Sequence, residues 1–395
     1  TEDRELALLA GLRPILSKAQ WEGLDFAESG VDVVPITSGP YVIDDFEPGR
    51  FISLRRNPDY WGRDSVPFMN GVHNIDEVRL EFFGDETAAF EAFKVGEVNT
   101  AREFNVARWE QQYNFPAVQD GDVVKAILPH ARPSGMTGFV MNTRRDVFAD
   151  WRVRDAMIHA FNFEFVNEAM TGSQQPRITS YWSNSPLGME DGPATGRVAE
   201  FLAPFADDLT PGTLEGYALP VSDGSERNRA NIGAALAQME AAGWTVQDGV
   251  MKNANGVPFT FNILLQVGAA EPQSMIDMYV QSLARLGITP TIETSDSAQF
   301  KEATDAFDFD MTYYRRGVSL SPGNEQYAYY GIDAADTPGG RNLMGVKSPA
   351  VDAMIGRLLT SASQDDFVAA VKALDRVLTA GRYVIPIYQW NISRI

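Results

Sequence analysis

Residues 259–267 read FTFNILLQV, with an apolar side chain at every second position. Since side chains alternate between the two faces of a strand, this pattern predicts a strand with one wholly apolar face. A helical pattern follows and ends at Gly287; its apolar residues are Met275, Met278, Tyr279, Leu283 and Leu286. Residues 288–292 and Phe307–Tyr314 predict two further strands with a short helix between them. Strand and helix in alternation indicate an α/β fold with crossover helices.

The first 250 residues add elements of the same kinds. A hairpin is predicted around the turn Glu47-Pro48-Gly49-Arg50, and an alternating strand around Val78–Phe82. Helices are predicted from Asp85 to Gly96, after the capping residue Asp150, and up to Gly243. Residues 171–197 and 317–349 are rich in Gly, Pro and aromatic residues, and we expect both to be loops. Long aromatic loops in a compact domain are usually functional or disordered, and aromatic residues argue against disorder.

Composition narrows the possible partners. The 395 residues are enough for two or three compact units. The net charge of -20 disfavours nucleic acid and anionic membranes, and it favours solubility. There is no Cys, which excludes disulfides and thiol chemistry. No apolar run is long enough to span a membrane. The chain begins TEDRELALLAGL, a charged helical pattern without an initiating Met or a signal peptide. We therefore expect a processed or truncated chain.

Motifs for catalysis or metal binding are mostly missing. The three histidines, His73, His130 and His159, lack metal-ligand spacing. Asp305, Asp308 and Asp310 alternate with Phe residues, which predicts an outward-facing set on a strand more than a calcium loop. The sequence contains neither a phosphate-binding loop nor a G-x-S-x-G nucleophile elbow. Paired carboxylates could still hydrolyse a substrate in a cleft, and Glu103 and Glu325 are two of many candidates.

Aromatic, Arg and amide residues cluster in the predicted loops. They include Trp109, Tyr113, Tyr181, Trp182, Tyr313, Tyr314, Arg315, Arg316, Tyr327, Tyr329 and Tyr330. Such residues line ligand clefts because they combine rigid contact area with a polar group. Some of them can equally cap the core, so the cluster by itself predicts a binding site without fixing its members.

Five segments resemble the extracellular solute-binding family 5, the oligopeptide, dipeptide and nickel receptors of ABC importers. They are SGPY at 38–41 with RNPDYWG at 56–62, FEAFKVGE at 90–97, FADWRVRDA at 148–156, 228–244 ending in AGW, and SPAVD at 348–352. Three more segments resemble the long-peptide and microcin C-type receptors in that family: NFPAV at 114–118, MNTRR at 141–145, and SLSPGNEQ at 319–326.

This resemblance implies a two-lobed periplasmic binding protein of type II, with an extra domain in the family. Residues 1–137 would be the latter part of lobe I, 138–388 lobe II, and 389–395 a return towards the hinge. The family's chains are longer, so lobe I would be incomplete here. Many members place an Asp for the ligand's amino terminus where this chain has Arg315 and Arg316.

The implied function is capture of peptides or peptide-like solutes for an inner-membrane ABC permease, by a monomer without cofactor, metal or enzymatic activity. The alternative from the residues is the carboxylate-dependent hydrolase. We expect these residues to bind ligand: Arg102, Glu103, Asn105, Trp109, Asn142, Arg177, Tyr181, Trp182, Tyr314, Arg315, Arg316, Ser319, Ser321, Asn324 and Glu325. Since neighbours on a strand point to opposite faces, only one of Arg315 and Arg316 would face the cleft. That one would bind an anionic group.

Overall fold

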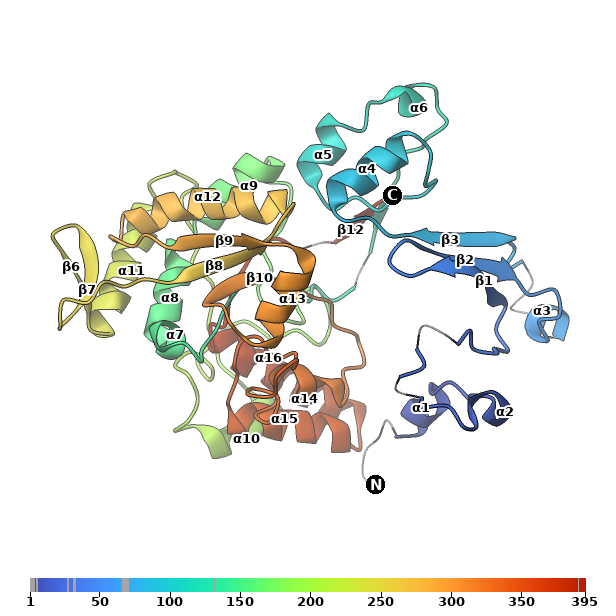
Figure 1. The fold of residues 1–395 in the computed structure, drawn as a ribbon. Helices are drawn as coiled ribbons and strands as arrows, with labels where there is room; N and C mark the ends of the chain where they lie inside the picture. Colours follow the sequence, from blue (N-terminus) through green and yellow to red (C-terminus); the bar gives the residue numbers. More distant parts are fainter. Residues whose placement is uncertain are drawn as a thin grey trace. The chain divides into compact units, whose positions relative to one another are not determined.

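A computed structural model describes residues 4, 6–26, 28–30, 33–65, 71–130, 132–389 and 391–395. The chain divides into two compact units (Figure 1): the smaller unit, Leu6–Ala101, and the larger unit, Arg102–Ile395, to which Arg4 also belongs. Among the described residues, no helix is long and apolar enough to cross a membrane.

The smaller unit is built on a three-stranded antiparallel sheet, β1-β2-β3. Its strands are β1 (Tyr41–Glu47), β2 (Phe51–Arg56) and β3 (Glu77–Glu81), and its helices are α1 (Leu6–Gly11), α2 (Lys18–Trp21), α3 (Gly62–Ser65) and α4 (Glu86–Lys94). The predicted hairpin and strand are confirmed. Asp85 caps α4 as predicted, by accepting a hydrogen bond from the Ala88 amide.

The larger unit is a three-layer α/β domain. Its five-stranded sheet has the order β11-β5-β10-β8-β9. The strands are β5 (Met136–Met141), β8 (Asn262–Gln266), β9 (Thr291–Ser295), β10 (Met311–Arg316) and β11 (Val384–Pro386). Two short pairs accompany it: β4 (Ile127–Pro129) with β12 (Ile392–Arg394), and β6 (Trp244–Gln247) with β7 (Val250–Asn253).

Helices cover both faces of this sheet (Figure 1). The helices of the larger unit, of which α5 and α6 lie away from this sheet, are α5 (Val106–Gln111), α6 (Pro116–Gln119), α7 (Asp146–Ala149), α8 (Trp151–Ala160), α9 (Phe163–Thr171), α10 (Gly196–Leu202), α11 (Arg229–Ala241), α12 (Ala270–Ala284), α13 (Ser297–Asp305), α14 (Glu325–Tyr330), α15 (Pro349–Thr360) and α16 (Gln364–Ala380), with a 3-10 turn at Ala203–Phe205. One apolar core joins a sheet face to α8, α11 and α12. The other joins the opposite face to α10, α15 and α16.

Several predicted elements of the larger unit need correction. β10 begins at Met311 and not at Phe307, because Phe307 adopts a left-handed φ of 55° that a strand does not allow. The strand predicted at 288–292 lies at Thr291–Ser295, while Ile288 is buried in the loop before it. The predicted loop 317–349 contains α14, whose buried residues Gln326 and Tyr330 give no apolar helical pattern.

The polar residues of segment 148–156 stabilise the fold around α8. Asp150 caps α8 by accepting from the Arg152 amide at 2.8 Å, and it also pairs with the Arg152 guanidinium. Arg154 is buried and donates to the carbonyl oxygens of Phe148 and Gly381. This arginine thereby ties α8 to the end of α16 by satisfying carbonyls that helix termini leave free.

Candidate ligand-binding site

The candidate site lies at one edge of the five-stranded sheet. β8 pairs in parallel with both β9 and β10, whereas β5 is antiparallel to β10 and β11. The carboxyl ends of β8, β9, β10 and β11 therefore share one edge with the start of β5. In open α/β sheets, ligands bind outside the carboxyl ends of the strands. Arg315 and Arg316 end β10 at this edge.

The two arginines point to opposite faces of the sheet. Arg315 is exposed, and its guanidinium carbon lies 4.1 Å from the centroid of the Phe104 ring. Arg316 is only 8% exposed; its guanidinium lies 3.4 Å from the Tyr329 ring centroid and donates to Gln326 Oε1 at 3.1 Å. Of this pair, solvent and ligand can reach Arg315, while Arg316 fastens α14 to the sheet.

Tyr313 lies on the same face of β10 as Arg315, two residues earlier. Nearby, the Tyr388 hydroxyl donates to Glu271 Oε1 at 2.7 Å. Glu271 is in the first turn of α12, directly after β8, and Tyr388 follows β11. Burial raises the pKa of Tyr388, and the Glu271 carboxylate raises that pKa further. Sequence reasoning missed this pair, because residues 117 positions apart give no local signal.

Glu103 belongs to a satisfied polar network next to Phe104. Its carboxylate accepts from the Asn105 amide at 2.6 Å, from Arg108 Nη1 at 3.4 Å and from the Tyr113 hydroxyl at 3.3 Å. Its own amide donates to the Arg394 carbonyl oxygen in β12. Burial raises the pKa of Tyr113, with Glu103 adding to the effect. Burial lowers the pKa of Arg394, and nearby carboxylates, Glu110 first, oppose that fall.

The loop at 171–197 brings Arg177 to the same edge. Arg177 bridges to Tyr388 in the backbone, and its side chain donates to the carbonyl oxygens of Pro220 and Pro386. Burial lowers the pKa of this arginine to about 10. Its hydrogen bonds hold the loop against β11, which is a structural role.

Tyr181 and Trp182 are 1% and 0% exposed. Their amides donate to Asp375 Oδ1 in α16, at 2.7 and 3.4 Å. The indole of Trp182 donates to the Ser319 carbonyl oxygen at 3.2 Å and so links both long loops. Side chains buried this deeply pack the core, and we leave them out of the proposed site.

The other predicted site residues are spread over two segments. In 102–109, Arg102 is exposed, Asn105 caps α5, and Trp109 is buried with the Lys125 ammonium 4.4 Å from its ring. In 314–325, Tyr314 is buried beside Arg316. Ser319 Oγ accepts from the Ser321 amide, Glu325 accepts from the Gly323 amide, and the exposed Asn324 starts α14.

Asn142 lies at the opposite edge of the sheet. It directly follows β5, which runs against β10, and it is fully buried. Its Nδ2 donates to the carbonyl oxygens of Phe307 at 3.1 Å and Phe309 at 2.9 Å. These bonds fix the turn that precedes β10, so the structure does not bring Asn142 together with the arginines.

The described residues form neither a metal-binding site nor a pair of catalytic carboxylates. No group of three His, Asp or Glu in that part of the chain could hold a metal ion. Asp305, Asp308 and Asp310 precede β10 and do not lie on it as predicted. They engage Lys301, Arg145 and the Asn262 amide, respectively.

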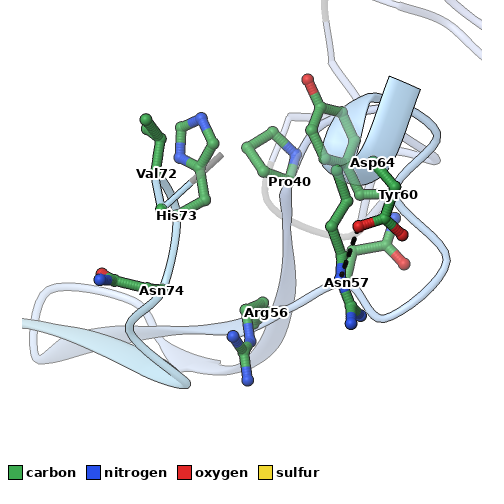
Figure 2. Close-up of a pocket in the computed structure, with 10 residues that line it drawn as sticks. Pro40, Arg56, Asn57, Tyr60, Asp64, Val72, His73 and Asn74 are labelled. Atoms are coloured by element: carbon green, nitrogen blue, oxygen red, sulfur yellow. Dashed lines mark ion pairs between the residues drawn. The ribbon is translucent and has the colours of Figure 1, made fainter. Parts of the chain in front are cut away.

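The smaller unit has a surface pocket of about 220 Å³ lined by residues of the SGPY and RNPDYWG segments, by Arg63 and Asp64, and by residues 71–74 (Figure 2). Pro40, Asn57, Tyr60 and His73 line it, and the Asn57 side chain donates to the Gly39 carbonyl oxygen. Gly62 packs against the Tyr60 ring: a Cβ there would lie 2.6 Å from the Tyr60 hydroxyl oxygen. The contacts within this pocket hold the segment together, and the described residues give no buried polar group awaiting a ligand there.

Comparison with known proteins places this fold among binding proteins. Residues 2–337 match the model of bacterial extracellular solute-binding proteins, family 5 Middle. A Brucella melitensis protein is 41% identical over 394 residues, covering 98% of this chain and 64% of that protein. The peptidoglycan-binding protein YepA of Agrobacterium fabrum is 38% identical over 395 residues, covering 97% and 64%. The chain thus spans just under two thirds of the length of these relatives.

Solved structures agree on the fold. The oligopeptide-binding protein AppA of Bacillus subtilis, in complex with a nonapeptide, has a TM-score of 0.70 at 16% identity over 96% of this chain and 67% of that chain. NikZ of Campylobacter jejuni, in complex with Ni(L-His), has a TM-score of 0.72 at 14% identity over 96% and 66%.

These similarities define the class: a mixed α/β protein with the fold of the two-lobed periplasmic binding proteins. More narrowly, the chain belongs to the bacterial extracellular solute-binding proteins, family 5, as its sequence segments predicted. Members of this family are binding proteins and not enzymes. The hydrolase alternative has no support among these findings.

Proposed function

We propose that this protein is a periplasmic receptor that captures peptides or peptide-like solutes and delivers them to an inner-membrane ABC permease. The observation that carries the proposal is the sheet edge at Arg315, where an accessible guanidinium lies over an aromatic ring in a fold shared with a solved oligopeptide-binding protein. Extended peptides present backbone amides and charged ends, which such groups recognise without a covalent step. The receptor is a monomer, has no enzymatic activity and needs no cofactor.

Lobe boundaries belong to this proposal too: residues 1–137 in lobe I, 138–388 in lobe II, and 389–395 returning to the hinge. From the predicted binding residues we retain the exposed ones near this edge and its loops, namely Arg102, Arg315, Ser319, Ser321, Asn324 and Glu325. The half-buried residues Tyr313, Phe104 and Glu271 join them.

Ligand capture and ligand hydrolysis give different outcomes in one experiment. The purified protein is incubated with a defined peptide pool that includes cell-wall stem peptides, since one relative is named a peptidoglycan-binding protein. Native mass spectrometry then identifies bound peptides, and denaturing analysis measures their integrity. A receptor retains a subset of peptides unchanged. Cleaved peptides, or an absence of any bound species across the pool, would contradict the proposal.

A further inference from the structure

The structure distinguishes the two neighbouring arginines, and Arg315 is the one available to a ligand. It is exposed at the carboxyl end of β10, on the sheet face that carries Tyr313. Arg316 already has its hydrogen bond to Gln326 and its stacking contact with Tyr329. Only Arg315 can therefore change partners without disrupting the packing of α14.

No carboxylate in the described part of the chain lies within ion-pair distance of Arg315, although the protein carries 53 acidic residues. Glu103 lies beside Phe104 in sequence, but its oxygens accept from Asn105, Arg108 and Tyr113. Glu271 accepts from Tyr388. The carboxylates of Glu103 and Glu271 therefore accept hydrogen bonds from other residues and not from Arg315.

Phe104 fixes how Arg315 presents its hydrogen-bond donors. The guanidinium carbon lies 4.1 Å from the ring centroid, a cation–π contact that holds the group over the ring. The planar fork of N–H donors points along the edge of the group, and that fork matches the two oxygens of a carboxylate. Stacking also limits the rotamers of a long side chain, which lowers the entropic cost of binding.

We infer that Arg315, held on Phe104, is the specificity-determining residue of the site and selects ligands that carry a carboxylate. This inference rests on the proposed receptor function and deepens it by naming the ligand class. The carboxylate can come from a peptide's C-terminus or from an acidic side chain, because the fork recognises the same group in both.

The test uses calorimetry with matched peptide pairs. Ala-Phe-Ala and its C-terminal amide differ only in the terminal carboxylate. Ala-Glu-Ala-amide and Ala-Gln-Ala-amide differ only in the side-chain carboxylate. For Arg315→Gln, we expect the affinity for the charged member of at least one pair to fall about tenfold or more, since a charge-assisted hydrogen bond is lost. The affinity for its neutral partner should change less than about twofold. The pair that responds identifies the source of the carboxylate.

Arg357→Gln is the matched control: Arg357 lies on α15, its guanidinium carbon is 4.4 Å from the ring centroid of Phe201 on α10, and it has no role in the candidate site. It should leave all four affinities unchanged. The inference is wrong if Arg315→Gln lowers the affinity for charged and neutral peptides equally, or leaves all affinities unchanged. It is also wrong if Arg357→Gln lowers the same affinities as much as Arg315→Gln does. None of these results would contradict the receptor function. If the wild-type protein binds none of the probes or pool peptides, the receptor function fails and the inference falls with it.

Discussion

Arg382 and Asp155 form a buried ion pair, with Arg382 Nε 2.6 Å from Asp155 Oδ1 and the two side chains 7% and 6% exposed. The pair joins the segment after α16 to α8 inside the larger unit. Arg382 also adopts a left-handed φ of 54°, which is unfavourable for a residue with a side chain. The contacts of its side chain hold the backbone in that conformation.

Breaking this pair from one side should be costly, because the remaining charge stays buried without its partner. We expect Asp155→Asn to lower the free energy of unfolding by about 3 kcal/mol in urea denaturation. The control Glu226→Gln removes the partner of Arg285 in a more exposed pair and should cost less than about 1 kcal/mol. Similar losses in both variants would contradict a special role for the buried pair.

Asp375 gives the larger unit a pH-dependent stability. Burial raises the pKa of this carboxyl to about 6, although hydrogen bonds from Ser180, Met189, Tyr181 and Trp182 oppose the rise. A folded-state pKa above the unfolded value means that the native state binds the proton more tightly. The stabilisation is therefore fully present below the unfolded pKa of about 4, and it is lost as pH rises through about 6.

Asp375→Asn should remove this pH dependence. Asparagine cannot accept from two sets of amides, so the variant should be less stable than wild type at every pH. The difference should be larger at pH 5 than at pH 8, because only the wild type gains from protonation. Paired denaturation curves at the two pH values measure it. A difference that is constant or grows towards pH 8 would show that the folded-state pKa is not raised.

Gly135 allows the chain to enter β5 directly beside β10. It has a φ of 65°, and a Cβ there would lie 2.1 Å from the Arg316 carbonyl oxygen. We expect Gly135→Ala to destabilise the larger unit by more than about 3 kcal/mol, since both the conformation and the contact are unfavourable. Gly233→Ala in α11 is the control: its Cβ would meet nothing within 4 Å, and it should stabilise the helix by up to about 1 kcal/mol. In thermal unfolding, the midpoint temperature should fall for Gly135→Ala and rise for Gly233→Ala.

The sequence predicted those helices and strands in which apolar residues recur at the regular spacing of a helix or a strand. Residues 259–267 were predicted as one strand, but β8 covers only Asn262–Gln266. Phe259 and Phe261 are buried before it, because an apolar pattern reports burial and not hydrogen bonding. The opposite orientations of Arg315 and Arg316 followed from strand geometry. Which of them is buried did not, because it depends on α14 packing against one face. Glu271 and Tyr388 meet only through the tertiary fold.

We expect Asn142 to stabilise the fold and not to bind the ligand. Asn142 is fully buried and donates to the carbonyl oxygens of Phe307 and Phe309, which also accept from Arg145. We expect Asn142→Ala to lower the free energy of unfolding by about 2 kcal/mol, as each carbonyl group loses one of its hydrogen bonds. Its position at the edge opposite Arg315 predicts no change in peptide affinity at a temperature where the variant is folded. A loss of affinity without a loss of stability would return Asn142 to the list of ligand-binding residues.

Arg316 should behave in the opposite way to Arg315. Its guanidinium stacks on Tyr329 and Tyr330 and donates to Gln326, all in α14, so its loss should loosen the link between β10 and that helix. We expect Arg316→Lys to keep the charge but lose the stacking and the hydrogen bond to Gln326, lowering the unfolding free energy by about 1–3 kcal/mol. The ratio of affinities for Ala-Phe-Ala and its amide should stay at the wild-type value, since Arg316 does not reach the ligand. Hydrogen exchange at α14 amides should rise, with Arg315→Lys as the control that leaves this exchange unchanged. A shifted affinity ratio with normal exchange at α14 would place Arg316, and not Arg315, in contact with the ligand's carboxylate.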